Sequence, residues 1–89
     1  MGFFLLNMYT VYVLYSEKYE KIYVGYTSNI EQRLLSHNEL ETKGYTIKYR
    51  PWKIIYTEEF LLKSDAMRRE KQLKSAKGRG FIWNLIGLA

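Results

Sequence analysis

Two segments rich in β-branched and aromatic residues lie close together near the start of the chain, and no other feature constrains the fold as strongly. Residues 9–16 and residues 21–26 have the composition that strands prefer. The four residues between them are polar and turn-like. We therefore expect an antiparallel hairpin in which this loop pairs Ser16 with Lys21.

The register of this hairpin decides where two tyrosines lie. Counting pairs outward from the loop places Tyr12 opposite Gly25. Tyr12 and Tyr23 are then diagonal neighbours on one face of the sheet, within aromatic reach of each other. A register shifted by one residue places the two phenol rings on opposite faces. A functional site that uses both tyrosines therefore requires the first register.

A helix follows the hairpin. The four residues that start at Ser28 have the S-x-x-E form of a capping box, with Glu31 in its last place. They predict a helix that runs to about Glu41. Arg33 and His37, four residues apart, flank the apolar stripe of this helix. We expect a guanidinium and an imidazole at the edge of the helix face that packs on the sheet.

The second half of the chain completes a small α/β (α+β) fold. Its pattern predicts a loop over 42–51, a third strand over 52–59, a helix capped by Ser64-Asp65 that runs to about Ser75, and a short apolar helix over 81–86 after a break at Gly78 and Gly80. Together these elements predict one domain over residues 1–89, with a three-stranded antiparallel sheet flanked by helices.

One carboxylate lies on the apolar stripe of the helix that starts near Ser64. Ala66 and Leu73 form this stripe with Met67 beside it, and Glu70 shares the same face. Glutamate is rarely buried unless it is paired or binds a metal. An ion pair with Arg33 or a hydrogen bond from a tyrosine hydroxyl is one explanation. A Mg²⁺ site is the other, because Mg²⁺ takes only one or two protein carboxylates and keeps several waters.

Four other residue types could serve phosphoryl chemistry, although each also has an ordinary structural explanation. The planar fork of Arg33 matches phosphate geometry, and a surface arginine looks the same in sequence. His37 can accept a proton or simply be a hydrogen-bonded helix residue. A hydroxyl of Tyr12 or Tyr23 beside a cation can help to activate water. Gly25 would let a substrate phosphate approach the backbone of the sheet.

The formal net charge of +5 is concentrated in the last third of the chain. Residues 1–62 contain seven Lys or Arg and seven Glu, whereas residues 63–89 contain seven Lys or Arg against two acidic residues. Arg68, Lys71 and Lys74 lie three residues apart and predict one basic row. Such a row is typical of a protein that binds a polyanion, and a solvated helix face has the same composition.

The composition also bears on compartment and on other kinds of site. The chain has no cysteine and one histidine, which excludes a disulfide-linked partner and a structural zinc centre. The apolar opening over residues 1–6 lacks the cationic start and the length of a signal peptide. No stretch is long and apolar enough to predict a membrane span. We therefore expect a cytoplasmic protein.

Taken in order, these segments resemble the GIY-YIG nuclease domain. They are TVYVL over 10–14, KIYVGYT over 21–27, RLLSHN over 33–38, RPWKIIY over 50–56, RREKQLK over 68–74 and GRGFI over 78–82. The last three resemble its small single-domain bacterial branch, which is similar to the N-terminal domain of the excision-repair nuclease subunit. Thr10 stands where the first motif has glycine, and Val11 and Val24 stand where the two motifs have isoleucine.

The resemblance implies a GIY-YIG endonuclease-like fold that hydrolyses DNA phosphodiester bonds with Mg²⁺ or Mn²⁺, in DNA repair or processing. It implies catalytic roles for Tyr12, Tyr23, Arg33, His37 and Glu70, with Glu70 as the metal ligand. The substrate-binding residues that we expect are Gly25, Arg68, Lys71, Lys74 and Asn84, of which Asn84 could equally be a hydrogen-bonded core residue.

Three functions remain open at this point. The first is a metal-dependent endonuclease in which either Tyr12 or Tyr23, aided by His37, orients or deprotonates the water. The second is a catalytically weak nucleic-acid-binding module with the same fold. The third is a protein-interaction adaptor, which would require the motif residues to be vestigial. The complete set of site side chains favours the enzyme.

Overall fold

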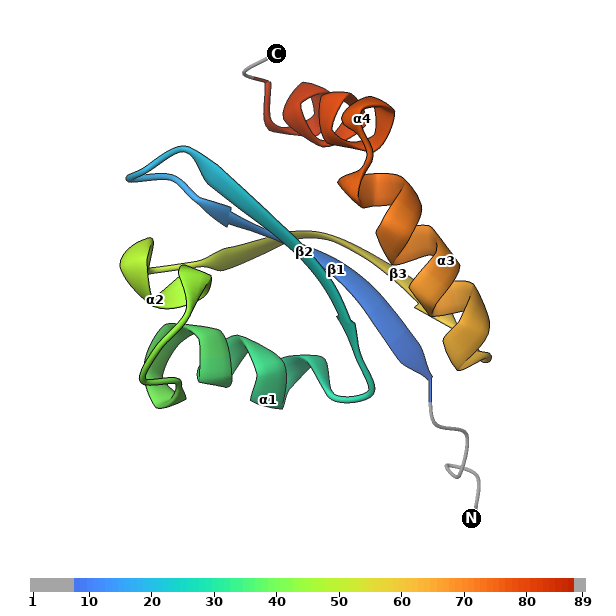
Figure 1. Ribbon diagram of the computed structural model, residues 1–89, viewed down its shortest axis with the longest axis horizontal. Helices are drawn as coiled ribbons and strands as arrows, with labels where there is room; N and C mark the ends of the chain where they lie inside the picture. Colours follow the sequence, from blue (N-terminus) through green and yellow to red (C-terminus); the bar gives the residue numbers. More distant parts are fainter. Residues whose placement is uncertain (1–7, 88–89) are drawn as a thin grey trace.

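The central strand of the fold is β1 (Tyr9–Ser16), which pairs with β2 (Lys21–Thr27) on one side and with β3 (Lys53–Phe60) on the other. Both pairings are antiparallel in the computed structural model, which describes residues 8–87. The helical elements are α1 (Ile30–Leu35), the π-helical segment η1 (Ser36–Leu40), α2 (Tyr45–Lys48), α3 (Lys63–Lys74) and α4 (Ala76–Ile86). The predicted sheet flanked by helices is confirmed (Figure 1). The opening residues 1–6 lie outside the described range.

The β1–β2 hairpin has the register that its loop predicts. Ser16 is opposite Lys21, and Tyr12 is opposite Gly25. Tyr12 and Tyr23 therefore lie on one face of the sheet, with ring centroids 6.3 Å apart. The polar loop and the alternation of side chains along the two strands agree on this register, so the local sequence was enough to predict it.

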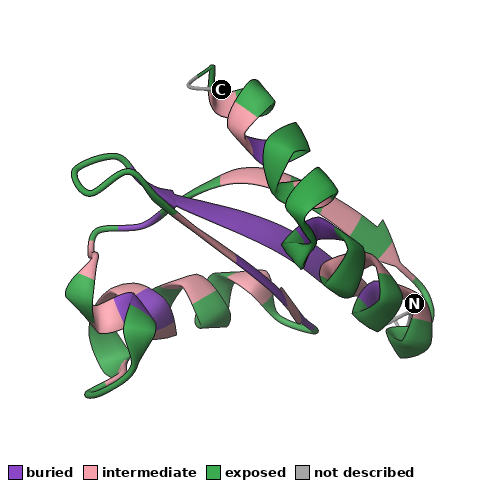
Figure 2. Cartoon of the chain, turned by 45° about the horizontal axis from the view of Figure 1, so that its top comes forward, coloured by how far each residue is buried: buried purple, intermediate pink, exposed green. Residues whose placement is uncertain are grey.

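Helices cover both faces of β1, and Figure 2 shows this strand as the buried centre of the fold. On one face, α3 and α4 pack against β1 and β2 through a buried cluster of Val11, Val13, Val24, Ala66, Leu73 and Ile82. On the other face, α1 and the segment before β3 pack through Tyr12, Leu14 and Trp52, with Ile30 and Leu34 beside them. Burial on two faces explains why β1 is apolar or aromatic at most positions.

Two details of the first helix differ from the prediction. Its N-cap is Asn29, not Ser28, and the Asn29 side chain accepts a hydrogen bond from the backbone N–H of Gln32 at 3.1 Å. The hydroxyl of Thr27 accepts the backbone N–H of Asn29 at 3.1 Å, and this turn holds Asn29 at the cap. After Leu35 the chain continues as a π-helical segment instead of a regular α-helix.

Further differences lie in the second half of the chain. The predicted loop over 42–51 contains the short helix α2. The N-cap of α3 is Leu62, so neither Ser64 nor Asp65 caps the helix. Of the side chains predicted on the stripe of α3, Ala66 and Leu73 are buried, whereas Met67 is exposed. No helix between residues 8 and 87 is both long enough and apolar enough to cross a membrane.

The break before the last helix lies at Ser75, earlier than predicted, so Gly78 and Gly80 are inside α4. The Ser75 hydroxyl donates to the carbonyl of Gln72 at 2.6 Å and accepts the N–H of Gly78 at 3.2 Å. A Cβ added at Gly78 would lie 2.2 Å from the Gln72 carbonyl oxygen and 2.5 Å from the Cα of Leu73. Glycine is therefore required because the two helix backbones nearly touch.

This contact gives a prediction for stability. Gly78→Ala should lower the free energy of unfolding by roughly 1–3 kcal/mol, because both clashing atoms are backbone and the helix junction must shift. Gly80→Ala is the matched control, since a Cβ there meets nothing within 4 Å and alanine favours a helix by up to about 1 kcal/mol. Thermal unfolding of both variants measures the difference, and equal melting temperatures would contradict the close contact.

Candidate active site

An open cleft of about 410 Å³ gathers most of the side chains predicted to be catalytic. Its lining includes Tyr12, Tyr23, Gly25, Arg33, Lys63 and Glu70. Four of the five predicted catalytic residues therefore face one shared space. The fifth, His37, is 2% exposed and lies behind Tyr12.

The cleft forms around the edge of the sheet. Tyr12, Tyr23 and Arg33 come from the side covered by α1, whereas Glu70 comes from α3, which packs on the opposite face. The two sides can meet because β2 is an edge strand with no neighbour beyond it in the described chain. The sequence predicted that these residues converge, but it did not show that a sheet edge joins them.

Gly25 lies at this edge for a reason that the sequence did not reveal. A Cβ at Gly25 would lie 2.5 Å from the Tyr12 hydroxyl oxygen and 2.7 Å from Tyr12 Cζ. The phenol ring of Tyr12 thus extends across the backbone of β2 into the space that a side chain would fill. Gly25 lines the cleft, and the space beside it holds the Tyr12 ring, whereas the approach of a phosphate to this backbone stays a prediction.

Tyr12, Tyr23 and His37 form a tight aromatic group at the base of the cleft. The Tyr12 hydroxyl is 2.9 Å from Nε2 of His37, and the ring of Tyr23 lies 4.9 Å from the imidazole, centroid to centroid. Burial, followed by the neighbouring Tyr23, raises the pKa of Tyr12 well above its usual range, although Arg33 opposes this shift. Tyr12 is therefore a phenol at neutral pH, and it needs an acceptor to give up its proton.

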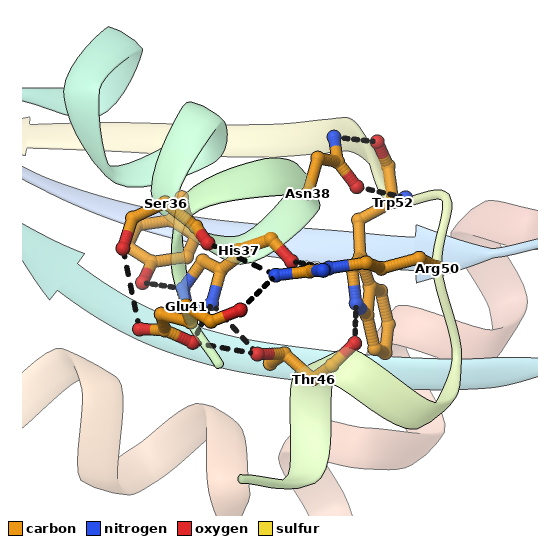
Figure 3. A network of polar contacts seen from close by, with 8 residues as sticks. Ser36, His37, Asn38, Glu41, Thr46, Arg50 and Trp52 are labelled. Atoms are coloured by element: carbon orange, nitrogen blue, oxygen red, sulfur yellow. Dashed lines mark hydrogen bonds and ion pairs between the residues drawn. The ribbon is translucent and has the colours of Figure 1, made fainter. Parts of the chain in front are cut away.

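A polar network holds the segment that carries His37 (Figure 3). Arg50 donates from Nε to the carbonyl of His37 at 2.6 Å and from Nη2 to the carbonyl of Glu41 at 2.9 Å. Asn38 exchanges two hydrogen bonds with the backbone of Trp52, at 2.7 and 3.0 Å. In sequence Arg50 and Trp52 are only parts of a motif, whereas in the structure they hold the backbone around the imidazole.

Burial lowers the pKa of His37 below its ordinary value, and the charges of Arg33 and Arg50 act in the same direction. Glu41 partly opposes them, because its Oε1 lies 3.7 Å from Nδ1 of His37. The imidazole is consequently neutral at physiological pH. A neutral imidazole has one nitrogen free to accept a proton, and this is the state that an acceptor for Tyr12 requires.

Glu70 is the carboxylate of the cleft. Its side chain is 20% exposed, and its Oε2 pairs with Nζ of Lys74 at 3.2 Å. The expected alternative partners, Arg33 and a tyrosine hydroxyl, are therefore not what Glu70 binds. Within residues 8–87 no three His, Cys, Asp or Glu side chains gather as a metal cage. A lone carboxylate in an open polar cleft suits Mg²⁺ or Mn²⁺, which retain water ligands.

The other predicted substrate-binding residues are spread over the surface. Arg68 pairs with Asp65 at 3.0 Å, and Lys71 is exposed on α3. Only Lys74 is tied to the cleft, through Glu70. Asn84 is exposed on α4, which rules out the expected alternative of a core residue, and it is absent from the cleft lining.

Beyond the predicted residues Tyr23 and Lys74, two further aromatic rings and one further cation extend the site along β2: Tyr45, Tyr49 and Arg79. The Tyr23 and Tyr45 rings are stacked, with centroids 6.3 Å apart and planes 27° apart, and Tyr49 follows Tyr45 at 4.9 Å. Lys74 and Arg79 share a neighbouring pocket with Tyr23 and Tyr45. Aromatic faces beside cations suit the bases and phosphates of a nucleic acid.

Comparison with known proteins points to one family. The profile of the GIY-YIG catalytic domain matches residues 8–84. A UPF0213 protein of Natronomonas pharaonis is 45% identical over 65 residues, which is 73% of this chain and 75% of that protein. A UPF0213 protein of Staphylococcus haemolyticus is 43% identical over 58 residues, which is 65% of this chain and 71% of that protein.

The fold also has a solved counterpart. The solution NMR structure of a UPF0213 protein from Bacillus halodurans superposes with a TM-score of 0.52 at 28% sequence identity, and the match covers 88% of this chain and 84% of that chain. The shared architecture is the small nuclease-type fold. The match of the GIY-YIG catalytic domain over residues 8–84 shows that this chain belongs to the GIY-YIG family.

Proposed function

We propose that this protein is a Mg²⁺- or Mn²⁺-dependent endonuclease that hydrolyses phosphodiester bonds of DNA, in a cytoplasmic repair or processing role. One observation carries the proposal. A single cleft brings together a phenol, a guanidinium and a half-buried carboxylate from three different elements of the fold, and the phenol is hydrogen-bonded to a buried imidazole behind it. These are the groups that hydrolysis of a phosphate diester needs.

Each side chain has a separate task in this mechanism. Glu70 would hold the cation, which when bound supplies a Lewis acid for the phosphoryl oxygens. Arg33, exposed in the cleft, binds a phosphate oxygen and neutralises the charge that builds up during attack. Tyr12 orients the attacking water and takes its proton. His37 Nε2, 2.9 Å from the Tyr12 hydroxyl, accepts the phenol proton in turn.

The hydrogen bond to His37 is the reason to assign the base to Tyr12. Proton transfer from water to a phenol is favourable only if the phenol loses its own proton at the same time. Tyr23 contributes its ring to the aromatic group and packs against the imidazole in a T-shaped arrangement. We therefore propose that Tyr23 positions the water and the substrate.

One observation favours the alternative of a catalytically weak nucleic-acid-binding module. Nζ of Lys74 lies 3.2 Å from Oε2 of Glu70, so the ammonium group pairs with the carboxylate that would bind the metal ion. A cation that binds Glu70 must displace this ammonium group. If it does not, the cleft and its neighbouring cations bind nucleic acid without turnover.

Cleavage of labelled DNA with Mg²⁺ or Mn²⁺, with and without a chelator, tests the proposal. Arg33→Ala should lower turnover by on the order of 10²–10³, the usual cost of losing one preorganised charge stabiliser. Arg33→Lys keeps the charge but loses the planar fork, so we expect partial recovery. Lys43→Ala removes an exposed cation that does not line the cleft and serves as the control. Cleavage that persists in the chelator would rule out the metal-dependent mechanism.

A further inference from the structure

A chain of hydrogen bonds continues behind the imidazole of His37, away from the cleft (Figure 3). Nδ1 of His37 lies 3.2 Å from the Thr46 hydroxyl, and this hydroxyl lies 3.0 Å from Oε1 of Glu41. The other carboxylate oxygen of Glu41 accepts a bond from the Ser36 hydroxyl at 3.3 Å. None of these groups except His37 belongs to the proposed catalytic set.

Counting the protons along this series of hydrogen bonds determines which nitrogen of His37 carries hydrogen. A carboxylate only accepts hydrogen bonds, so the single hydroxyl proton of Thr46 points to Glu41. The Thr46 oxygen can then only accept from Nδ1 of His37, which must carry the imidazole proton. In a neutral ring Nε2 is consequently unprotonated, and it accepts the hydrogen bond of the Tyr12 hydroxyl.

We propose that Thr46 and Glu41 are positioning residues that hold His37 in the Nδ1–H tautomer and so keep Nε2 ready to accept the phenol proton of Tyr12. The catalytic consequence rests on the proposed function. As the water oxygen bonds to phosphorus, the leaving oxygen departs with the electron pair of its P–O bond and takes a proton from solvent water. The proton of the attacking water moves to Tyr12, and the Tyr12 proton moves to Nε2. The resulting imidazolium is stabilised through Thr46 by the negative charge of Glu41.

Neighbouring residues hold the hydrogen-bonded groups behind His37 in place. Thr46 is 4% exposed, and its carbonyl accepts a bond from Nε1 of Trp52 at 2.7 Å. The carbonyl of Glu41 is held by Arg50 at 2.9 Å. The backbones that carry Thr46 and Glu41 are therefore held by contacts that do not involve the imidazole, and the two side chains are bonded to each other. A ring held in this way keeps one tautomer.

The tautomer can be measured without any activity. His37 is the only histidine of the chain, so a long-range proton–nitrogen NMR spectrum of the imidazole needs no assignment by mutation. At neutral pH we expect the shift of an unprotonated nitrogen for Nε2 and of a protonated nitrogen for Nδ1. A protonated Nε2 in the wild-type protein would overturn the proposal, whether or not the protein cleaves DNA.

Substitution of Thr46 tests the positioning role. Thr46→Val keeps the shape but removes the hydroxyl, so we expect the Nε2–H tautomer to appear and turnover to fall by about 10- to 100-fold, as when an outer partner of a functional histidine is lost. Thr46→Ser restores the hydroxyl and should restore both readouts. Thr57→Val is the matched control, because Thr57 is exposed on β3 opposite Tyr12 and outside the chain of hydrogen bonds.

Three further outcomes separate this proposal from the proposed function. Glu41→Gln should keep the tautomer, since the amide oxygen can still accept from Thr46, but should lower turnover because the negative charge is gone. A Thr46→Val protein that retains one tautomer and wild-type turnover would overturn the positioning role. A wild-type protein that shows the Nδ1–H tautomer but no metal-dependent cleavage would overturn the proposed function and leave the tautomer assignment standing.

Discussion

Glu70→Gln is expected to abolish metal-dependent cleavage, with a loss on the order of 10³ or more, because the carboxylate that would hold the cation becomes a neutral amide. Binding of DNA should be unchanged or slightly tighter, since one negative charge leaves the cleft and Lys74 loses its ion-pair partner. Cleavage rates and fluorescence anisotropy, measured on the same preparation, give the two quantities. Mn²⁺ titration should also show weaker binding of the cation.

Asp65→Asn provides the control for this result. It makes the same change of charge on the same helix, but Asp65 pairs with Arg68 and does not line the cleft. Its cleavage rate should match that of the wild type. If Glu70→Gln cleaves as fast as the wild type, the activity comes from a contaminant and the binding-module function is the better description.

Tyr12→Phe should lower turnover by on the order of 10²–10⁴, the usual range for loss of a general base. The substitution keeps the ring that covers Gly25 and removes only the hydroxyl that is 2.9 Å from His37 Nε2. This buried nitrogen then lacks its donor, and the free energy of unfolding should fall by roughly 1–3 kcal/mol. Single-turnover cleavage and chemical denaturation measure the two effects.

Tyr23→Phe is the comparison that decides between the two tyrosines. We expect a smaller loss of turnover, because the ring of Tyr23 and its contact with His37 both remain. The opposite ranking, with Tyr23→Phe the more damaging variant, would transfer the role of base to Tyr23. The buried pair of Tyr12 and His37 would then be a structural hydrogen bond.

The β1–β2 hairpin shows how much of the fold the local sequence predicts. The polar loop over residues 17–20 and the alternating strands on either side determine the register, and the register places Tyr12 and Tyr23 on one face. The stripe of α3 similarly buries Ala66 and Leu73, as its spacing predicts. These predictions succeed because strand and helix periods relate residues that are near in sequence.

Helix boundaries were less predictable because they depend on which polar side chain accepts a hydrogen bond from the free backbone N–H groups at the start of the helix. Ser28 and Asn29 are both good caps, and the turn made by Thr27 selects Asn29. The glycine at position 78 resembled a helix breaker in sequence. Its actual role is to let α4 approach the backbone at Leu73, a contact between two helices that no local pattern contains.

The sequence by itself determined the strands, their pairing in the hairpin, and the identity of the candidate catalytic side chains. Only the tertiary structure decided that Glu70 and Tyr12 line one cleft around the edge of β2, that the Tyr12 ring fills the space at Gly25, and that Thr46 and Glu41 lie behind His37. The physical reason is the separation in sequence between the interacting residues. Periodicity and propensity act between neighbours in sequence, whereas these contacts join elements that come together only when helices pack on both faces of the sheet.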